Sequence, residues 1–181
     1  MSAPFEVQIL SAGDLSEHLR DQIRSLDTRV DWGQPPGVSS LVWADSPPWV
    51  ALVQVQGTLA AHVGIVEREI LIGSRLLRVG GISSVMTEPE LQGRGYATAA
   101  LHQATDFIRD RLSVPFALLT CLEHRRSFYE RFGWVVLDQP VVCDQPAGKA
   151  LLTCPGRLMM SLSFGAGAQP TGPVDLRGLP W

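Results

Sequence analysis

The sequence predicts one domain of the mixed α/β (α+β) class, with a mostly antiparallel central sheet and helices on both of its faces. Apolar residues make up 45% and charged residues 18% of the 181-residue chain, a balance typical of a globular protein with one core. Strand-like runs dominate residues 49–87, and after residue 95 helical and strand-like patterns alternate. We therefore expect a single domain over residues 1–181.

The first half is expected to form a strand, a helix, a broken segment and a meander. Phe5 to Leu10 alternates like a short strand, and residues 11–14 supply caps for a helix over about residues 15–25. Residues 27–49 contain four prolines and three tryptophans, so we expect them to line a pocket. Two strands joined at Gln56-Gly57 and a third after the turn at residues 72–75 predict an antiparallel meander.

The second half is expected to alternate between helices and strands, with one parallel strand pair. Apolar residues at helical spacing predict an amphipathic helix after the loop at residues 88–95: Ala97, Leu101, Ala104, Ile108 and Leu112. Residues 115–120 read as a buried strand, and residues 123–132 as a second helix that Gly133 ends. Short strands are expected at residues 134–138 and 157–164. The glycine- and proline-rich tail after them is of a kind that usually frays.

The loop EPELQGRGYAT, residues 88–98, joins a strand to a helix and contains two glycines. Backbone amides in such a turn point into one volume, with the positive end of the helix dipole behind them, which predicts an anion site. Gly93 and Gly95 can take positive φ, and Arg94 adds a charge at the rim. A Walker loop would need Lys-Ser/Thr, and a dinucleotide fingerprint would need a third glycine in place of Thr98. A plain strand-to-helix turn remains the alternative.

Two motifs resemble the GCN5-related N-acetyltransferases (GNAT). Residues 92–97, QGRGYA, match the Gln/Arg-x-x-Gly-x-Gly/Ala loop of that family, and RRSFYERFGW, residues 125–134, resembles its second signature. Over nearly its whole length the chain looks most like the aminoglycoside 2′-N-acetyltransferases, through Asp31-Trp32, the hairpin at residues 62–81 and a final Trp181. The resemblance implies the GNAT fold, in which the sheet splays to admit acetyl-CoA.

The resemblance also implies which residues hold acetyl-CoA, the expected cofactor. Its diphosphate would sit on the amides of the loop, and its pantetheine arm would pair with the preceding strand as if it were another strand. The cofactor-binding residues implied are Val85, Met86, Thr87, Gln92, Gly93, Arg94, Gly95, Tyr96, Ala97 and Thr98.

Acetyl transfer to an amine needs an oxyanion donor, an acid and a route for the amine proton. The resemblance implies the Val85 amide as donor and Tyr129 as acid, although helix spacing alone favours a core role for Tyr129. Related enzymes carry a glutamate where this chain reads Gly-Ile-Ser-Ser at residues 81–84, and the hydroxyl of Ser83 is a weak base. Either another carboxylate acts, or the amine is already neutral. This departure suggests a narrower aminoglycoside, such as kasugamycin.

A cationic amino sugar calls for acidic and aromatic groups in its pocket. The candidates are Asp27, Asp31 and Trp32, with Asp144 at the same mouth and the carboxylate of Trp181, by resemblance, binding substrate amines. Trp43 and Trp49 are further candidates. Turn-capping aspartates and core tryptophans are the alternative interpretation of these residues.

Charge and composition argue against several other classes. A net charge of −3 without a basic cluster is unlike a nucleic-acid-binding protein, and the chain lacks an apolar run of membrane-spanning length. The N-terminal residues do not resemble a signal peptide, so we expect a cytoplasmic protein. The four histidines have no metal-site spacing, and we propose no metal. Cys121 could act as a nucleophile, but a buried thiol is the expected role.

Related enzymes are often dimers, so a homodimer is one expectation. Two other functions remain open at this point. One is an acetyltransferase that acts on another small amine or on a protein amine. The other is a non-catalytic acyl-CoA-binding sensor, which the missing strand carboxylate favours and Tyr129 disfavours.

Overall fold

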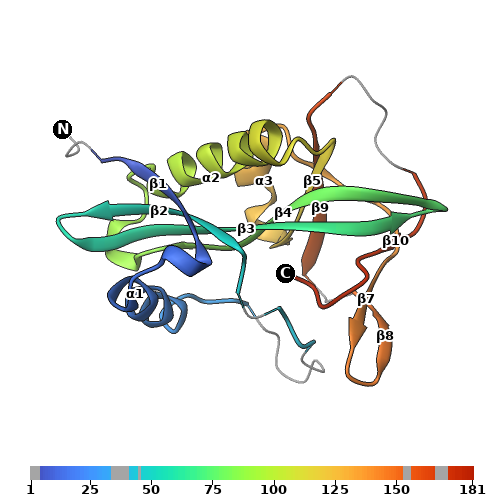
Figure 1. Cartoon of the computed structure of the whole chain (residues 1–181), viewed down its shortest axis with the longest axis horizontal. Coiled ribbons are helices and arrows are strands. Elements are labelled where there is room, and N and C mark those ends of the chain that lie inside the picture. The colour runs from blue at the N-terminus through green and yellow to red at the C-terminus, as the bar shows by residue number, and fades with distance from the viewer. Residues whose placement is uncertain (1–4, 34–40, 45, 153–155, 166–170) are drawn as a thin grey trace.

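The computed structural model describes residues 5–33, 41–44, 46–152, 156–165 and 171–181. Its described strands form one curled, mixed sheet, with α2 on one face and α1 on the other (Figure 1). This arrangement confirms the predicted mixed α/β class with helices on both faces of the sheet.

The N-terminal elements lie close to their predicted positions. β1 (Val7–Ser11) is followed by a short 3₁₀ turn, η1 (Ala12–Asp14), and by α1 (Glu17–Asp27). Ser16 caps α1, since its hydroxyl accepts a hydrogen bond from the amide of Leu19 at 3.2 Å. α1 therefore begins and ends two residues later than the sequence pattern predicted.

The predicted antiparallel meander is present and forms the centre of the sheet. Its strands are β2 (Trp49–Val55), β3 (Thr58–Ile72) and β4 (Arg75–Thr87). Both residues of the Gln56-Gly57 turn have positive φ, 51° and 79°, as a tight hairpin turn requires. β1 extends the sheet by pairing with β2.

The predicted helix and strand after the loop are also present. A 3₁₀ turn, η2 (Pro89–Leu91), leads into α2 (Tyr96–Phe107), which continues as a π-helical turn, η3 (Ile108–Leu112). β5 (Phe116–Leu122) then lies parallel to β4, but they pair only from Gly80–Ala117 to Ile82–Leu119. Beyond that point the two strands part. The second predicted helix is a 3₁₀ turn, η4 (Glu123–Arg125), and then α3 (Arg126–Glu130).

The C-terminal part holds more structure than the sequence pattern predicted. Its strands are β6 (Val135–Val136), β7 (Val141–Gln145), β8 (Gly148–Leu151), β9 (Arg157–Ser163) and β10 (Val174–Asp175). The expectation of a frayed tail is wrong, because β10 pairs antiparallel with β3 and parallel with β7. This second parallel pair and the β7–β8 hairpin were not predicted.

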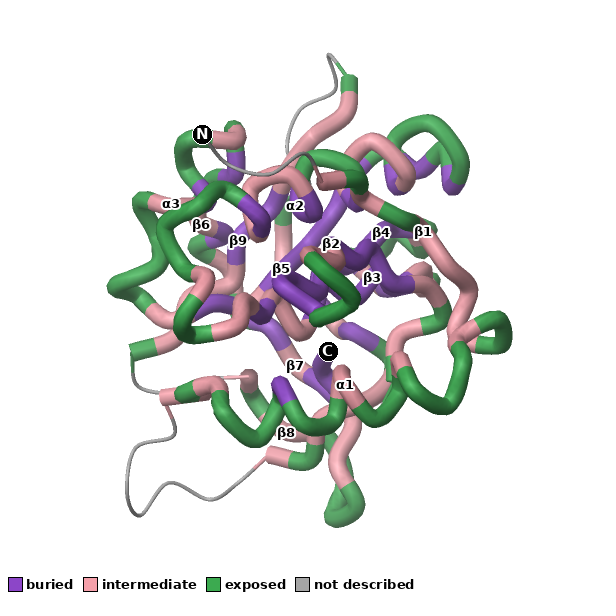
Figure 2. Tube along the Cα trace, turned by 90° about the vertical axis from the view of Figure 1, so that its left-hand side faces the viewer, coloured by how far each residue is buried: buried purple, intermediate pink, exposed green. Residues whose placement is uncertain are grey.

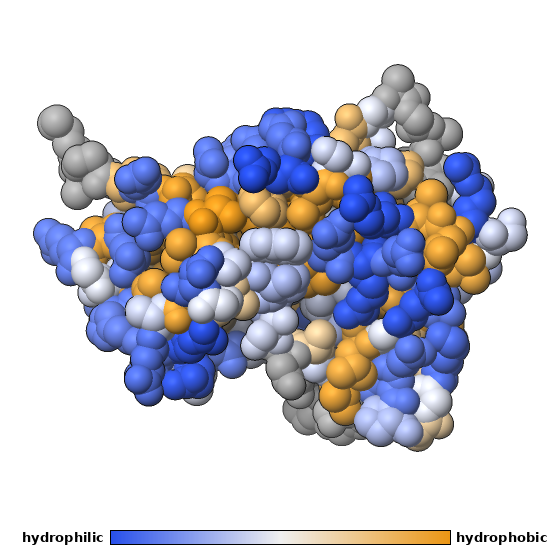
Figure 3. All heavy atoms as spheres, viewed as in Figure 1, coloured by the Kyte–Doolittle hydropathy of each residue, from blue (hydrophilic) through white to orange (hydrophobic). Residues whose placement is uncertain are grey.

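Burial is concentrated in the central strands and on the inner side of α2, whereas the periphery is exposed (Figure 2). On the face shown in Figure 3, hydrophobic residues come to the surface in separate patches between hydrophilic ones. α2 packs against β1–β4 on one face of the sheet, and α1 covers a smaller cluster on the other face.

Two adjacent glycines of β4 allow close packing on opposite faces of the sheet. A Cβ on Gly80 would lie 2.2 Å from Ile108 Cγ2, and one on Gly81 would lie 2.3 Å from Trp181 Nε1. Gly80 thus lets the end of α2 approach the sheet, and Gly81 makes room for the indole of Trp181. The packing of the Trp181 indole against Gly81 holds the end of the chain on the sheet.

Candidate functional site

A cavity of about 550 Å³ opens where β4 and β5 part. Three regions that are far apart in the sequence form its walls: the parting ends of the two strands, the loop before α2, and η4 with α3. Part of the segment between α1 and β2 completes the mouth. The lining residues used below are Asp31, Trp32, Ser83, Ser84, Val85, Thr87, Gln92, Gly93, Arg94, Gly95, Tyr96, Ala97, Thr98, Cys121, Arg125, Phe128, Tyr129, Arg131 and Arg157.

The loop has the backbone geometry predicted for an anion site. Gly93 and Gly95 have φ of 76° and 84°, and Gly95 is the N-cap residue of α2. No atom lies within 4 Å of a Cβ built on either glycine, so the space above both is open. Amides at the N-terminus of a helix lack intrahelical acceptors. The loop therefore presents free N–H groups to the cavity, with the helix dipole behind them.

A β-bulge at Ser84 and Val85 shapes the β4 side of the cavity. Gly64 pairs with Ser83 and His62 with Met86, so that Ser84 and Val85 together oppose a single residue of β3. Ser84 has φ of 45°, which is unusual for a residue other than glycine. The bulge takes both residues out of the regular β3 ladder, and both line the cavity.

His62 holds this bulge from the neighbouring strand. Its side chain is buried, and its Nδ1 donates a hydrogen bond of 2.8 Å to the carbonyl of Ser84. Burial lowers the pKa of His62 below its ordinary 6.5, although the Ser84 carbonyl and the charge of Asp27 act in the opposite direction. The ring is therefore neutral and carries its proton on Nδ1.

The lowered pKa of His62 predicts a loss of stability in mild acid. The unfolded chain binds a proton near pH 6.5 while the folded chain does not, so the free energy of unfolding should fall as the pH drops below 6.5. The contribution of this one residue is at most about 1.4 kcal/mol per pH unit. Urea unfolding at pH 7.5, 6.5 and 5.5 measures it. The variant His62→Phe, which cannot titrate, should show a smaller slope, and an unchanged slope would refute the assignment.

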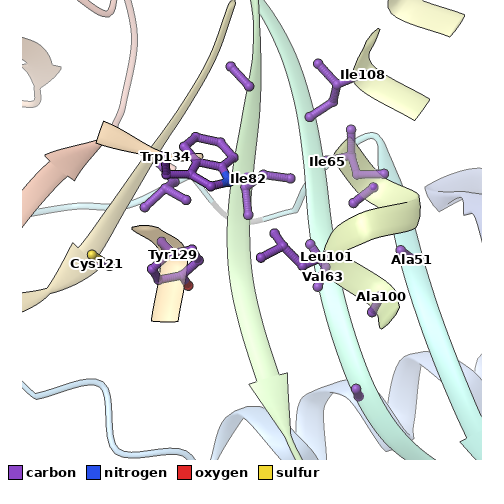
Figure 4. Close-up of a cluster of buried hydrophobic side chains, with 14 of the residues drawn as sticks. Ala51, Val63, Ile65, Ile82, Ala100, Leu101, Ile108, Cys121, Tyr129 and Trp134 are labelled. Atoms are coloured by element: carbon purple, nitrogen blue, oxygen red, sulfur yellow. The ribbon is translucent and has the colours of Figure 1, made fainter. Parts of the chain in front are cut away.

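Tyr129 lies on α3 and is buried, with 7% of its surface exposed on the cavity wall. Its ring contacts Phe128 edge-on, at 5.0 Å between centroids, and lies near Trp134 and Cys121 (Figure 4). Tyr129 is therefore both a core residue and part of the cavity wall. Burial, with a smaller effect of Cys121, raises the pKa of the phenol well above 10, so it is protonated at neutral pH.

Cys121 also reaches the cavity, from the end of β5. Burial raises the pKa of its thiol to about 11, which the charge of Arg157 only partly offsets. The thiol donates to Met160 Sδ at 3.6 Å. At neutral pH very little thiolate is present, so the geometry favours the buried-thiol interpretation over a nucleophile.

Two of the predicted substrate residues lie at the mouth of the cavity. Asp31 and Trp32 both line it. The Asp31 carboxylate accepts the amide of Gly33 at 2.8 Å, and Trp32 Nε1 donates to the Asp27 carbonyl at 3.3 Å. Asp31 thus caps a turn and also lines the cavity. Asp31 is the only carboxylate among the described lining residues.

Other predicted residues lie away from the cavity. Asp144 on β7 is paired with Lys149 at 2.7 Å, and the side chain of Asp27 is not part of the wall. Trp49 packs in the core against Phe107, with 5.7 Å between ring centroids. Asp144 and Trp49 thus have pairing or packing partners, and none of these three residues lines the cavity.

Met86, Trp43 and Trp181 are also outside the wall. The Met86 side chain is buried under α1, so only its backbone could serve a ligand. Trp43 lies beneath the guanidinium of Arg157, which does line the wall. The Trp181 indole is 8% exposed and is packed in a core cluster beside Gly81.

Sequence reasoning missed three arginines of the wall: Arg125, Arg131 and Arg157. The first two stand inside the RRSFYERFGW motif, where their closeness to Tyr129 was the available signal. Arg157 begins a predicted strand and carries no signal of its own. Only the pairing of β9 with β5 brings it to the cavity.

Neither a membrane span nor a metal site is found in the part of the chain that the structure describes. No described helix is both long and apolar enough to cross a bilayer. Over the same residues, no group of histidine, cysteine and carboxylate side chains is arranged to hold a metal ion.

The chain is similar in sequence to one protein-family model and to two curated proteins. A family model described as an acetyltransferase (GNAT) domain matches residues 40–137. An aminoglycoside 2′-N-acetyltransferase of Mycolicibacterium fortuitum is 29% identical over 98 residues, which are 54% of this chain and 49% of that protein. Nodulation protein A of a Mesorhizobium strain is 31% identical over 125 residues, 65% of this chain and 61% of that protein. The chain thus spans about half to three fifths of these relatives.

Solved structures show the same fold. A GNAT family N-acetyltransferase from Escherichia coli, solved in complex with CoA, superposes with a TM-score of 0.63 over 99% of this chain and 98% of that one, at 13% identity. A GNAT family acetyltransferase from Brucella melitensis, in complex with acetyl-CoA, gives 0.58 over 93% and 94%, at 17% identity. At these identities the likeness establishes the fold alone.

Proposed function

Because the chain belongs to the GNAT acetyltransferase family, we propose that it transfers an acetyl group from acetyl-CoA to the amino group of a small molecule. The observation that carries this proposal is the cavity between β4 and β5, which joins the glycine loop, the Val85 bulge and Tyr129. Two solved relatives in fold were obtained with CoA or acetyl-CoA, which supports the choice of cofactor.

The cofactor would lie along the edge of β4 that β5 leaves free. The diphosphate would accept hydrogen bonds from the amides of residues 93–97, where the positive end of α2 favours negative charge, whereas the Gln92 amide already donates to the Pro89 carbonyl. The pantetheine arm would pair with the backbone of residues 85–87, because no described strand pairs with β4 on that side beyond Ile82. The thioester would then stand between Val85 and Tyr129.

Transfer would proceed in one ternary complex. The amine nitrogen attacks the thioester carbonyl, the C–S bond breaks, and the amine proton leaves to water or a base. The amide of Val85 would donate to the carbonyl oxygen as it becomes negative. Tyr129 would protonate the leaving thiolate; at its ordinary pKa this costs about 2 kcal/mol. Burial of Tyr129 raises that cost.

The amine proton can leave in one of two ways, to a base on the cavity wall or before the amine binds. Ser83 lines the cavity opposite Gly64, whose missing side chain leaves room for the hydroxyl, but a hydroxyl is a weak base. Asp31 is the candidate carboxylate on the described wall. The other option is an acceptor amine that is already neutral, as amines next to electron-withdrawing oxygens partly are.

The finer proposal for the acceptor is an amino group of an aminoglycoside, which the transfer would inactivate and so confer resistance. It is supported by the named activity of the Mycolicibacterium fortuitum relative and by Asp31 and Trp32 at the mouth. A narrow member such as kasugamycin fits the serine that replaces the usual strand carboxylate.

Release of free thiol tests the transfer. The protein is mixed with acetyl-CoA and a panel of amines that includes aminoglycosides, and coenzyme A thiol is followed with a chromogenic disulfide. Release with at least one amine is expected. Tight binding of acetyl-CoA without release from any amine would favour the non-catalytic sensor instead.

Calorimetry tests the cofactor site separately. The variant Gly95→Ala should weaken acetyl-CoA binding by roughly tenfold, because φ of 84° strains any residue with a Cβ by about 1 to 2 kcal/mol. Gly57→Ala, at φ of 79° in a remote hairpin turn, is the matched control and should leave the affinity unchanged. Equal affinities for both variants would contradict the loop assignment.

A further inference from the structure

We infer that the acceptor carries an oxyanion, a carboxylate or a phosphate monoester, in addition to its amine, and that Arg157 binds this group. The inference rests on the proposed function, because it names the acceptor of the same transfer reaction. It also restricts the range of acceptors, because a sugar that carries only positive charges would then be a poor acceptor.

The wall of the cavity carries an excess of positive charge. Among the described lining residues, the charged ones are four arginines and one aspartate: Arg94, Arg125, Arg131, Arg157 and Asp31. Arg94 belongs to the loop that would hold the diphosphate. Arg131 lies over the ring of Phe128 at 5.4 Å, on the same side of the cavity as Tyr129. A cavity that served only cationic acceptors would be expected to show the opposite balance.

Arg157 stands apart from the surfaces assigned to the cofactor. It begins β9, and β5 lies between β9 and β4 in the sheet, so Arg157 is two strands from the bulge and the loop. Its neighbours come from the segment before β2, since its guanidinium contacts Trp32 and Trp43. Asp31 and Trp32 of that segment line the mouth through which an acceptor would enter.

The guanidinium is held in place, and no carboxylate among the described residues forms an ion pair with it. Arg157 Nη2 donates to the Trp32 carbonyl at 2.5 Å, and its Cζ lies 5.3 Å from the centre of the Trp43 ring. None of the ion pairs in the described part of the chain includes Arg157. A guanidinium has five N–H donors, so most of them remain available for a ligand.

A guanidinium in this state can bind a carboxylate or a phosphate group. Arginine binds carboxylates and phosphates through two parallel hydrogen bonds, and a guanidinium that is already fixed loses little freedom when it does so. Asp31 directly precedes Trp32, whose carbonyl accepts the hydrogen bond from Arg157. Asp31 and Arg157 therefore line the same mouth of the cavity. A carboxylate and a guanidinium placed together in this way match an acceptor that carries both an amine and an acid group.

Matched acceptor pairs test the inference. Each pair contains two primary amines of similar size that differ by the acid group, for example phenylalanine and phenylethylamine, or phosphoethanolamine and ethanolamine. We expect the wild-type protein to prefer the acidic member of a pair. In Arg157→Gln the KM of that member should rise roughly 10- to 100-fold, with kcat and the KM of the neutral member within twofold. In Arg157→Lys the KM of the acidic member should lie between the values for the wild type and for Arg157→Gln.

Controls separate this role from the others. Arg111→Gln, on the exposed side of η3, should behave like the wild type. The affinity for acetyl-CoA, measured by calorimetry, should be unchanged in Arg157→Gln; a tenfold loss would make Arg157 a cofactor residue and overturn the inference. Equal effects on both members of each pair, or a wild-type preference for the neutral member, would also overturn it.

A binding experiment keeps the inference testable without turnover. Calorimetry of the CoA-bound protein with the acidic amines should show binding that Arg157→Gln lacks. Absence of thiol release from every amine would count against the proposed transfer, whereas this Arg157-dependent binding would still support the acid-group site. Binding that is equal in wild type and Arg157→Gln would refute it.

Discussion

Replacing Tyr129 by phenylalanine is expected to lower kcat about 100-fold while leaving the affinity for acetyl-CoA within twofold. The variant keeps the ring that contacts Phe128 and removes only the hydroxyl on the cavity wall. The leaving thiolate would then have to take its proton from water. Steady-state thiol release gives kcat, and calorimetry gives the cofactor affinity.

The tyrosine variant needs a control for folding, because Tyr129 is 7% exposed and belongs to the main core cluster. The unfolding midpoint of Tyr129→Phe should stay within a few degrees of the wild type, since the core loses no carbon atoms. A kcat equal to that of the wild type would make Tyr129 a purely structural residue.

The variant Cys121→Ser should retain most of the activity, because the thiol is buried and protonated at neutral pH. Loss of turnover in this variant would instead support the interpretation of Cys121 as a nucleophile.

Replacing Trp181 by alanine is expected to destabilise the protein by about 3 to 5 kcal/mol. Its indole fills the slot above Gly81, and the guanidinium of Arg68 lies 4.8 Å from the ring centre. Arg68 also donates to the Leu179 carbonyl at 2.7 Å, which fixes the segment just before the tryptophan. Removing the indole leaves a cavity in the core that neighbouring side chains can fill only in part.

Urea unfolding measures this loss, with Leu151→Ala as the control. Leu151 is 53% exposed, so its truncation should change the free energy of unfolding by less than about 0.5 kcal/mol. A loss below about 1 kcal/mol in Trp181→Ala would show that the tail contributes little to the fold.

The cofactor side of the site could be predicted from sequence because its signals are local. Gly93 and Gly95 stand in one short loop, and their positive φ follows from the turn that joins a strand to a helix. Tyr129 lies within one motif on one short helix. Such features depend on neighbours a few residues away, so a single sequence contains most of the information.

The acceptor side could be predicted only in part. Asp31 and Trp32 were found because a segment rich in proline and tryptophan suggested a pocket, and both line it. Asp144 was placed at the mouth from its charge alone, and the structure pairs it with Lys149 on the β7–β8 hairpin. Arg157 was missed because strand pairing, and no local pattern, brings it to the cavity.

The sequence by itself determined the order of helices and strands up to β6, the glycine loop and the tyrosine motif, because periodicity and turn chemistry act over short stretches of chain. Only the tertiary structure decided where β4 and β5 part, that His62 of β3 holds the bulge at Ser84, and that Trp181 packs into the space left by Gly81. Those features depend on strand register and on contacts between distant residues, which the pattern of one sequence does not specify.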